Sequence, residues 1–328
     1  MSQLTTRFTK TVGIEIPIIC GAMYPCSNPE LVASVSEAGG IGIIQPLSFV
    51  YVHKYNFKEA LAKIKSITLK PVGMNIITEK SSQIYQKRMS QWLDEALEFG
   101  VRFFITSLGN PRWVVDRVSK FGGIVYHDTT ERKWSLKALQ EGVTGLICVN
   151  NDAGGHAGRF SSKELFDQHS DLGVSLICAG GIGSPEKYYE ALKFGYDGIQ
   201  MGTRFIATTE CTANDDYKKT IVNAFASDIV LTEKVTGVPL AVINTPYVKK
   251  VGTKVGPISK YFLQHKNFKH LLRLFYTLSS AIKLKRASQK GNKYNDYYQA
   301  GKSVEGVKSI ISAKEIINSF ANFVNSKG

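Results

Sequence analysis

Short apolar runs alternate with helix-like segments through most of this chain, and this alternation restricts the fold more than any other feature. The apolar runs span residues 17–23, 40–45, 71–77, 103–109, 123–129, 145–151, 175–181 and 198–205. Near-continuous apolar runs are typical of parallel strands buried on both faces, and several of the segments between them begin with Pro and end at Gly, as helices do. Eight such repeats in about 200 residues predict a TIM (β/α)8 barrel. A doubly wound open sheet remains the alternative, because counting strands does not reveal closure.

The alternation stops after the eighth run. Residues 228–244 are typical of one or two strands, and 260–286 form a basic segment with an apolar stripe at helical spacing. We therefore predict a small inserted α/β domain at 211–287, basic and mostly helical, within a barrel made of 1–210 and 288–328. The basic helix either packs on the barrel, which its apolar stripe favours, or lies on a membrane surface.

The formal net charge of +14 is concentrated in one place. Residues 249–293 contain twelve Lys or Arg and no Asp or Glu. Such a surface attracts an acidic protein, a phosphorylated ligand or a membrane, but a solvated helical face without a partner explains it equally well. Nucleic-acid binding is not favoured, because no recognised nucleic-acid motif accompanies the charge.

The sequence favours a cytoplasmic protein. No apolar run approaches the ~20 residues that span a bilayer, and the N-terminus lacks the apolar core of a signal peptide. Five cysteines at irregular spacings favour buried reduced thiols over disulfides or a zinc site; they are Cys20, Cys26, Cys148, Cys178 and Cys211. The sequence leaves the oligomeric state open, with a homodimer among the alternatives.

Glycine-rich turns follow the last three apolar runs, in N-N-D-A-G-G-H-A-G, A-G-G-I-G and Q-M-G-T-R-F. Glycine lets backbone N–H groups approach an anion without an intervening Cβ, and the N-terminus of a following helix favours negative charge. In a TIM barrel the turns after strands 7 and 8 form a phosphate site at the C-terminal face. We therefore predict that Gly180, Gly181, Gly202 and Thr203 bind the phosphate of a cofactor.

Amide side chains at two strand ends suit the ring of flavin mononucleotide (FMN), which requires hydrogen-bond donors and acceptors. Asn75 lies near the end of the third apolar run and Gln200 in the eighth, and Met23 offers a flat apolar neighbour. Turn chemistry at a strand end explains either amide alone, but together with both glycine turns the amides favour a cofactor. Gly154 and Met201, in the same motifs, complete the predicted FMN site.

His156 is the candidate catalytic residue. Its unperturbed pKa of ~6.5 allows proton exchange near neutrality, so it is suited to take a proton from a carbon acid or to polarise a substrate oxygen. Three glycines flank it and leave little side-chain packing around it. A catalytic role is therefore favoured over a structural one.

Three further residues are candidates for substrate binding. His127 ends the fifth apolar run, where a hydrogen-bonded core histidine is an equal interpretation. Tyr298 and Lys302 lie four residues apart in Y-Y-Q-A-G-K-S and hold an anionic substrate if that loop folds over the barrel mouth. On the spacing alone, an exposed loop lysine is the better interpretation.

Six motifs, in this order, resemble those of the nitronate monooxygenases, formerly called 2-nitropropane dioxygenases. They are P-I-I-C-G-A-M, E-A-G-G-I-G, P-V-G-M-N, D-A-G-G-H-A-G, C-A-G-G-I-G and I-Q-M-G-T-R-F-I-A-T-T-E. The later T-E-K-V-T-G-V-P and A-G-K-S segments are also similar to that family. Flavin-dependent enoyl-acyl-carrier-protein reductases and NADH:quinone reductases share most of these motifs.

The resemblance implies a TIM barrel with noncovalently bound FMN and with His156 as the catalytic base. It also implies that His127, Tyr298 and Lys302 are substrate-site residues of the class I type. The implied reaction is the oxidation of alkyl nitronates with O2 to carbonyl compounds and nitrite.

The chain departs from the family pattern at three places. Asp152 stands where Glu is usual, Cys20 where Gln is common, and Val149-Asn150 where Gln-Gly is usual, which removes one expected flavin contact. Two other hypotheses stay open. One is an NAD(P)H-dependent FMN reductase of quinones or enoyl thioesters, which the basic segment favours because acyl carrier proteins and NAD(P)H are acidic. The other is a flavin-less protein that binds another phosphorylated ligand.

Overall fold

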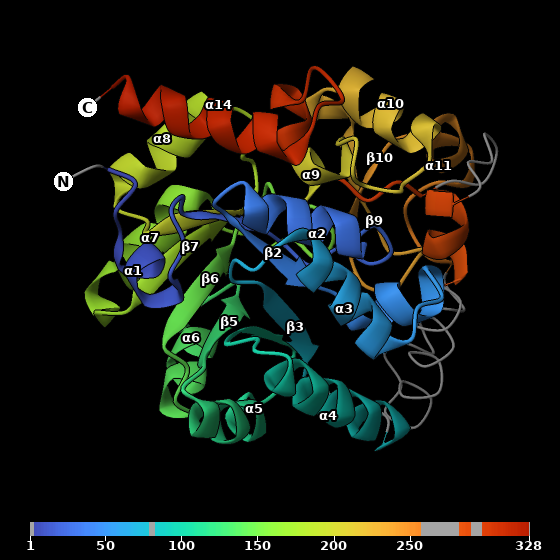
Figure 1. Ribbon diagram of the computed structural model, residues 1–328. Coiled ribbons are helices and arrows are strands. Elements are labelled where there is room, and N and C mark those ends of the chain that lie inside the picture. The colour runs from blue at the N-terminus through green and yellow to red at the C-terminus, as the bar shows by residue number, and fades with distance from the viewer. Residues whose placement is uncertain (1–2, 79–82, 257–281, 290–296, 328) are drawn as a thin grey trace.

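Eight parallel strands form a closed barrel in the computed structural model, which describes residues 3–78, 83–256, 282–289 and 297–327 (Figure 1). The strands are β1 (Ile18–Cys20), β2 (Ile41–Ile44), β3 (Gly73–Ile77), β4 (Phe103–Ser107), β5 (Ile124–Thr129), β6 (Gly145–Val149), β7 (Ser175–Ala179) and β8 (Gly198–Met201). The barrel closes where β1 pairs with β8, with Ile19 opposite Gln200. Closure confirms the predicted TIM barrel and excludes the open sheet.

Helices surround the barrel. They are α1 (Arg7–Val12), α2 (Pro29–Glu37), α3 (Phe57–Ile67), α4 (Gln83–Glu98), α5 (Arg112–Val118), α6 (Arg132–Gln140), α7 (Ser162–His169), α8 (Pro185–Phe194), α9 (Thr203–Ile206) and α14 (Ala313–Asn325). A π-helix, Ser48–Val52, follows β2. Short 3-10 turns follow α5 (Ser119–Phe121) and α7 (Ser170–Leu172). The last helix, α14, packs against α8 through Phe320 and Tyr188, whose rings lie 5.7 Å apart.

Side chains alternate between the barrel interior and the helix layer along each strand. On β5, Ile124 and Tyr126 belong to the interior cluster, whereas Val125 packs with the residues of the surrounding helices. The same alternation assigns Cys148 and Cys178 to the helix layer. This alternation, the phase of each strand, decides which polar residues at the strand ends face the barrel interior and can reach its mouth.

Helix α1 closes the N-terminal end of the barrel. Phe8 is fully buried, and its ring lies 5.7 Å from that of Phe103 and 5.8 Å from that of Tyr126. Phe103 and Tyr126 contact each other edge to face at 5.1 Å. This aromatic cluster fills the bottom of the barrel.

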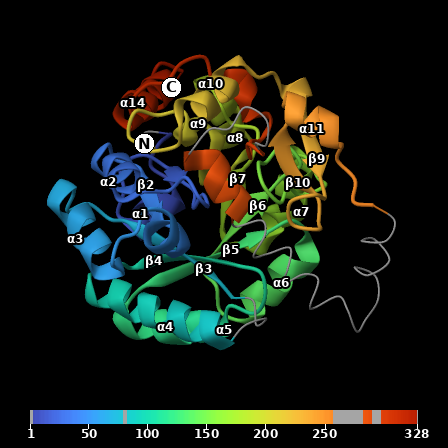
Figure 2. The same cartoon turned by 90° about the vertical axis from the view of Figure 1, so that its right-hand side faces the viewer.

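The chain beyond the barrel forms a small sheet. Strands β9 (Ile229–Thr232) and β10 (Leu240–Ile243) pair antiparallel in the region predicted to hold one or two strands. They are accompanied by α10 (Asp215–Asn223), a 3-10 turn (Ala226–Asp228) and α11 (Pro246–Val251). Figure 2 views the molecule from the side on which β9, β10 and α11 lie.

Most of the predicted basic helix at 260–286 lies outside the described residues, as does part of the basic segment 249–293. Residues 282–289 are helical. The boundaries of an inserted domain at 211–287 stay a prediction.

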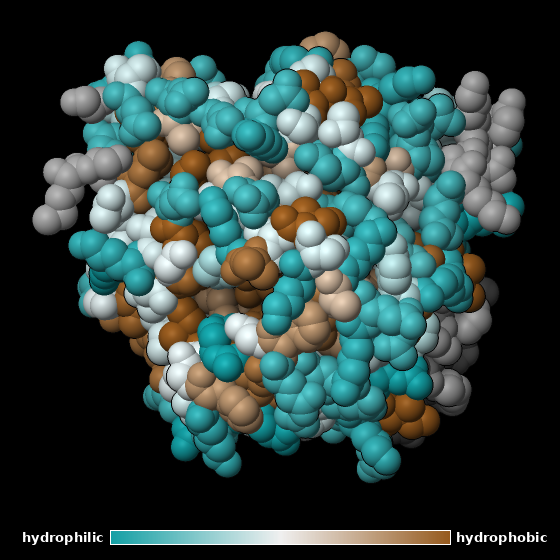
Figure 3. Space-filling model, in the orientation of Figure 1, coloured by the Kyte–Doolittle hydropathy of each residue, from teal (hydrophilic) through white to brown (hydrophobic). Residues whose placement is uncertain are grey.

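The outer surface is mixed in character. Hydrophilic side chains dominate the face in Figure 3, and apolar ones are scattered among them. Within the described parts of the chain, no helix combines the length and apolar character needed to cross a membrane.

Candidate active site

Two predicted amide residues point into the barrel at its C-terminal end. Asn75 alternates with Met74 and Ile76, and Gln200 with Ile199 and Met201; all four apolar neighbours pack in the helix layer. The Oε1 atom of Gln200 is buried and has no hydrogen-bond partner among the described residues. A buried polar atom without a partner indicates a missing ligand or water. The two amides therefore face the barrel interior, whereas the Met201 side chain packs in the helix layer.

The turn after β7 has the backbone conformation that the phosphate prediction requires. Gly180 and Gly181 have φ values of +118° and +75°. A Cβ at Gly180 would lie 2.1 Å from the Oδ1 atom of Asn150, so no larger residue fits there without displacing Asn150. Glycine is thus needed at this turn for both its conformation and its size.

Asn150 stands where the family usually has Gly, and the structure gives it a clear role. Its Nδ2 donates to the carbonyl of Gly180 at 3.0 Å, and its Oδ1 accepts from the backbone N–H of Asp152 at 2.9 Å. The side chain thereby ties the loop after β6 to the glycine turn after β7. This departure from the family pattern supports the turns.

The turn after β8 lies beside the loop after β1. A Cβ at Gly202 would lie 3.4 Å from the Sδ atom of Met23, so the two residues are neighbours at the barrel mouth. Thr203 is buried, and its Oγ1 accepts from the backbone N–H of Gly301 at 3.0 Å. Gly154 packs against the same Gly301, because a Cβ at Gly154 would lie 2.8 Å from that nitrogen.

His156 is held in a defined tautomer by the small sheet. Its Nδ1 lies 3.2 Å from the carbonyl oxygen of Pro239, in the loop before β10. A carbonyl only accepts, so Nδ1 carries the proton and Nε2 keeps its lone pair. Ala241 of β10 also donates to the carbonyl of Gly155 at 2.7 Å. The hairpin therefore braces the histidine loop.

The surroundings of His156 favour its neutral form. Solvent reaches part of the side chain, yet the protein packed around the ring lowers its pKa from the ordinary value. The hydrogen bond to Pro239 opposes this shift. A neutral imidazole with a free Nε2 lone pair has the form that a general base needs at pH 7.

Lys302 is engaged in an ion pair. Its Nζ lies 2.8 Å from Oδ1 of Asp152, and both side chains are about half exposed. The Lys302 backbone N–H also donates to the carbonyl of Asp152 at 2.9 Å. The loop around Lys302 therefore lies against the histidine loop, and the ammonium neutralises the carboxylate next to the glycine turn at Gly181.

Tyr298 lies in the protein interior. It is 4% exposed, and its ring stacks on that of Tyr217 with centroids 4.4 Å apart. Its carbonyl accepts from the backbone N–H of Ile243 on β10 at 2.8 Å. The Tyr298 side chain is thus buried against Tyr217, and its backbone contacts β10.

His127 is not brought together with the other candidates. It shares the phase of Val125 on β5, so its side chain faces the helix layer. Its Nδ1 lies 2.9 Å from Oγ1 of Thr106, and burial lowers its pKa to about 4. These contacts are those of a hydrogen-bonded core histidine.

Asp128, the next residue, has the inward phase instead, and the sequence interpretation missed it. Its Oδ1 is buried without a hydrogen-bond partner among the described residues, and burial raises its pKa to about 7. Ionisable groups with strongly shifted pKa values often mark functional sites. The phase of Ile124 and Tyr126 along β5 was the signal that could have identified Asp128.

The residues present fit a flavin. The glycine turn after β7 has the positive φ values of an open backbone turn, and the amide oxygen of Gln200 is buried without a partner among the described residues. No cluster of three or more His, Cys, Asp or Glu in the described part of the chain is arranged to hold a metal ion. The fold and the site together define a flavin-dependent oxidoreductase built on a TIM barrel.

Comparison with known proteins defines the family. The nitronate monooxygenase profile matches residues 5–322, so this chain belongs to the nitronate monooxygenase family. Family membership makes it an enzyme and removes the alternative of a flavin-less binding protein.

Three similar proteins illustrate the range of the relatives. A probable nitronate monooxygenase of Staphylococcus saprophyticus is 25% identical over 92% of both chains. The (3aS,4S,5R,7aS)-5-hydroxy-7a-methyl-1-oxo-octahydro-1H-indene-4-carboxyl-CoA dehydrogenase of Rhodococcus jostii is 28% identical over 76% of this chain and 69% of that protein. The structure of FabK from Thermotoga maritima superposes with a TM-score of 0.80 at 26% identity, covering 98% of this chain and 97% of FabK.

Proposed function

We propose that this protein is an FMN-dependent nitronate monooxygenase, which oxidises alkyl nitronates with O2 to carbonyl compounds and nitrite. The observation that carries the proposal is His156, whose Nδ1–H donates to Pro239 and whose Nε2 therefore keeps its lone pair. The family assignment and the staphylococcal relative support the same reaction.

FMN, when bound, accepts electrons from the substrate and passes them to O2. Gly180, Gly181 and Gly202 would hold its phosphate through backbone N–H groups. Asn75 and Gln200 would hydrogen-bond the ring, which would give the Gln200 oxygen the partner that it lacks among the described residues. These residues bind and orient the cofactor and leave the proton chemistry to His156.

His156 has two tasks in this proposal. For a neutral nitroalkane, its Nε2 takes the proton from the carbon that bears the nitro group. A nitronate is already deprotonated and its oxygens only accept hydrogen bonds, so the ring positions them only after Nε2 has taken up a proton. Lys302 can contribute a positive charge to an anionic substrate only if it leaves Asp152, since the two side chains form an ion pair.

The choice of electron donor tests this function. The purified yellow protein would be mixed anaerobically with NADH or with a nitronate, and the flavin absorbance followed. We expect the nitronate to bleach the flavin rapidly, NADH to bleach it barely, and oxygen uptake to accompany nitrite release in air. Rapid bleaching by NADH with no response to nitronate contradicts the proposal.

The second candidate is an NAD(P)H-dependent FMN reductase of enoyl thioesters or quinones. It is favoured by two relatives: the Rhodococcus enzyme, which is named for a CoA thioester, and FabK, which superposes over nearly the whole chain. In the same experiment this candidate predicts rapid bleaching by NADH, followed by reoxidation with an enoyl thioester or a quinone under anaerobic conditions.

A further inference from the structure

Two cysteines far apart in the sequence meet beside the barrel mouth. Cys26 lies in the loop between β1 and α2, and Cys211 follows α9. The Sγ of Cys211 donates to the carbonyl oxygen of Cys26 at 3.4 Å, and the two thiols also hydrogen-bond to each other. Both side chains are at most 2% exposed, and both thiols are free.

The surroundings shift the pKa values of the two thiols in opposite directions. The hydrogen bond from Cys26 lowers the pKa of Cys211, and the same contact together with burial raises the pKa of Cys26. The ammonium of Lys218, itself 7% exposed, donates to the carbonyl of Thr208 at 2.8 Å and favours negative charge on the sulfurs. Cys211 is therefore the thiol of the pair that ionises more easily, and Cys26 holds its proton more tightly.

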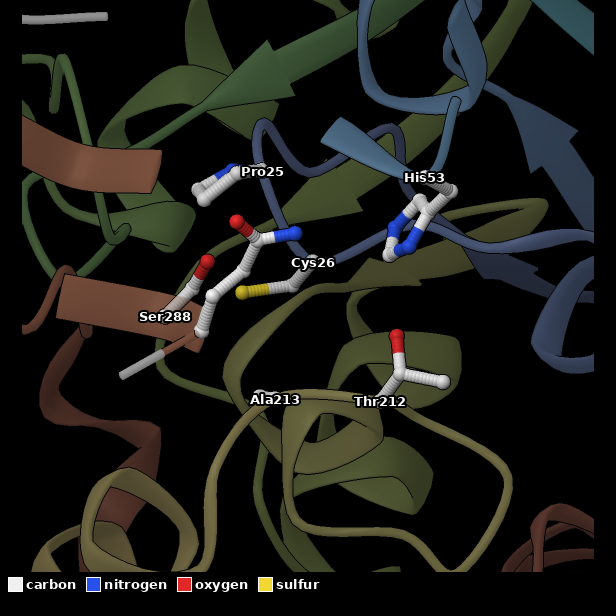
Figure 4. A pocket seen from close by; sticks show the side chains of 7 residues that line it. Pro25, Cys26, His53, Thr212, Ala213 and Ser288 are labelled. Carbon is white, nitrogen blue, oxygen red and sulfur yellow. The ribbon is translucent and has the colours of Figure 1, made fainter. Parts of the chain in front are cut away.

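A pocket opens onto Cys26. It has a volume of about 250 Å³, and Pro25, His53, Ala213 and Ser288 are among the residues that line it with Cys26. Figure 4 shows the Cys26 sulfur directed to the side of Ser288, with His53 on the opposite side. A molecule as small as hydrogen peroxide fits this space, so Cys26 is the thiol that it would meet first.

A second cysteine pair provides an internal contrast. Cys148 and Cys178 are direct neighbours on β6 and β7. Burial raises the pKa of both thiols, that of Cys178 to about 12. The thiolate is the reactive form of cysteine, and neither thiol of this pair has a lowered pKa as Cys211 has, so the pair should resist oxidation although its backbones are adjacent.

We propose that Cys26 and Cys211 are a peroxide-sensitive dithiol that is converted to a disulfide. In the first step the Cys26 sulfur attacks one peroxide oxygen, and the proton of Cys26 passes to the departing oxygen. The O–O bond breaks, Cys26 becomes a sulfenic acid, and the departing hydroxide is protonated to water. Cys211 then attacks the Cys26 sulfur and releases a second water. Two thiols lose two hydrogens in total, and the peroxide is reduced to two waters.

Mass spectrometry of the flavin-loaded protein tests the dithiol independently of the enzyme's substrate. The reduced protein would be treated with hydrogen peroxide, alkylated under denaturing conditions and mapped by peptide. We expect a loss of about 2 Da before alkylation, two thiols fewer to alkylate, a linked peptide of Cys26 and Cys211, and reversal by dithiothreitol.

Single variants assign the order of the steps. Cys211→Ser should stop at a sulfenic acid on Cys26 that dimedone traps, Cys26→Ser should form no disulfide, and Cys178→Ser should behave as the unchanged protein. Five alkylatable thiols after peroxide treatment of the unchanged protein overturn the proposal. A disulfide between Cys148 and Cys178, formed in place of the Cys26–Cys211 link, also overturns it.

Discussion

The two ends of the barrel differ in what fills their interior. At the N-terminal end, the rings of Phe8, Phe103 and Tyr126 fill the interior and contact one another at 5.1 to 5.8 Å. At the C-terminal end, a carboxylate oxygen of Asp128 and an amide oxygen of Gln200 are buried and have no partner among the described residues. One end is therefore filled by packed rings, and the other holds two buried polar atoms that a ligand would satisfy.

This difference separates the end of the barrel that contributes stability from the end that carries the chemistry. In TIM barrels the C-terminal face carries the active site and the opposite face contributes stability. Changes at the mouth should therefore alter flavin binding and turnover more than folding, and changes at the bottom should do the reverse. The following experiments test whether the two ends have these separate roles.

The largest expected effect concerns His156. His156→Ala removes the base, so turnover with a neutral nitroalkane should fall about 10²- to 10⁴-fold while the yellow colour remains. Steady-state oxygen uptake and the visible spectrum measure the two quantities. His127→Gln is the matched control, because His127 faces the helix layer, and its turnover should stay within about threefold of the unchanged enzyme. Equal losses in both variants would argue against the assigned orientations.

The next effect belongs to the opposite end of the barrel. Phe8→Ala leaves a cavity among the aromatic rings and should lower the free energy of unfolding by about 3–5 kcal/mol. Denaturant unfolding followed by circular dichroism measures the loss. At a temperature where the variant is folded, its affinity for FMN should equal that of the unchanged protein. A large loss of FMN affinity would show that the two ends are coupled.

A smaller effect is expected from the buried carboxyl of Asp128. Because burial raises its folded pKa to about 7 from an ordinary 3.8, the folded protein holds a proton that the unfolded chain releases. This contribution is present below pH 4 and is lost as the pH rises to about 7. In the flavin-free protein, Asp128→Asn should therefore be more stable than the unchanged chain by up to about 4 kcal/mol at pH 8, with little difference at pH 4.

Urea unfolding at pH 4, 6 and 8 measures this dependence. Asp116→Asn serves as the control, since Asp116 forms an exposed ion pair with Arg112 and such pairs contribute less than about 1 kcal/mol. If Asp128→Asn has the same pH profile as the unchanged chain, the carboxyl is not held in its neutral form.

Much of the barrel could be predicted because its signal is local. Each strand is a continuous apolar run and each glycine turn follows directly, so the strand ends and the residues beside them, such as Asn75 and Gly180, can be placed from the sequence. Closure of the barrel could not be predicted, because the pairing of β1 with β8 joins residues about 180 positions apart.

The side-chain assignments were harder because they depend on strand phase and on distant partners. A continuous apolar run hides which residues face inward, so the sequence alone could not assign the outward phase to His127 or the inward phase to Asp128. The carbonyl of Pro239 that orients His156, the Asp152 carboxylate that pairs with Lys302, and the ring of Tyr217 that stacks on Tyr298 all come from segments remote in the chain. No spacing rule predicts such contacts.

A matched pair of glycine variants tests the division between the two ends most directly. Gly180 and Gly122 both have positive φ values, +118° and +69°, but Gly180 lies at the C-terminal end of β7 and Gly122 precedes the N-terminal end of β5. A left-handed alanine costs roughly 1–2 kcal/mol at either position. The Cβ of an alanine at position 180 would lie 2.1 Å from the Oδ1 atom of Asn150. At position 122 the same Cβ would have no neighbour within 4 Å.

The measurement is the dissociation constant of FMN, from the quenching of flavin fluorescence on titration into the flavin-free protein. The account predicts that Gly180→Ala weakens FMN binding at least about tenfold, whereas Gly122→Ala lowers stability alone and leaves the dissociation constant unchanged. Equal FMN affinities in the two variants would contradict the placement of the flavin at the C-terminal end of the barrel.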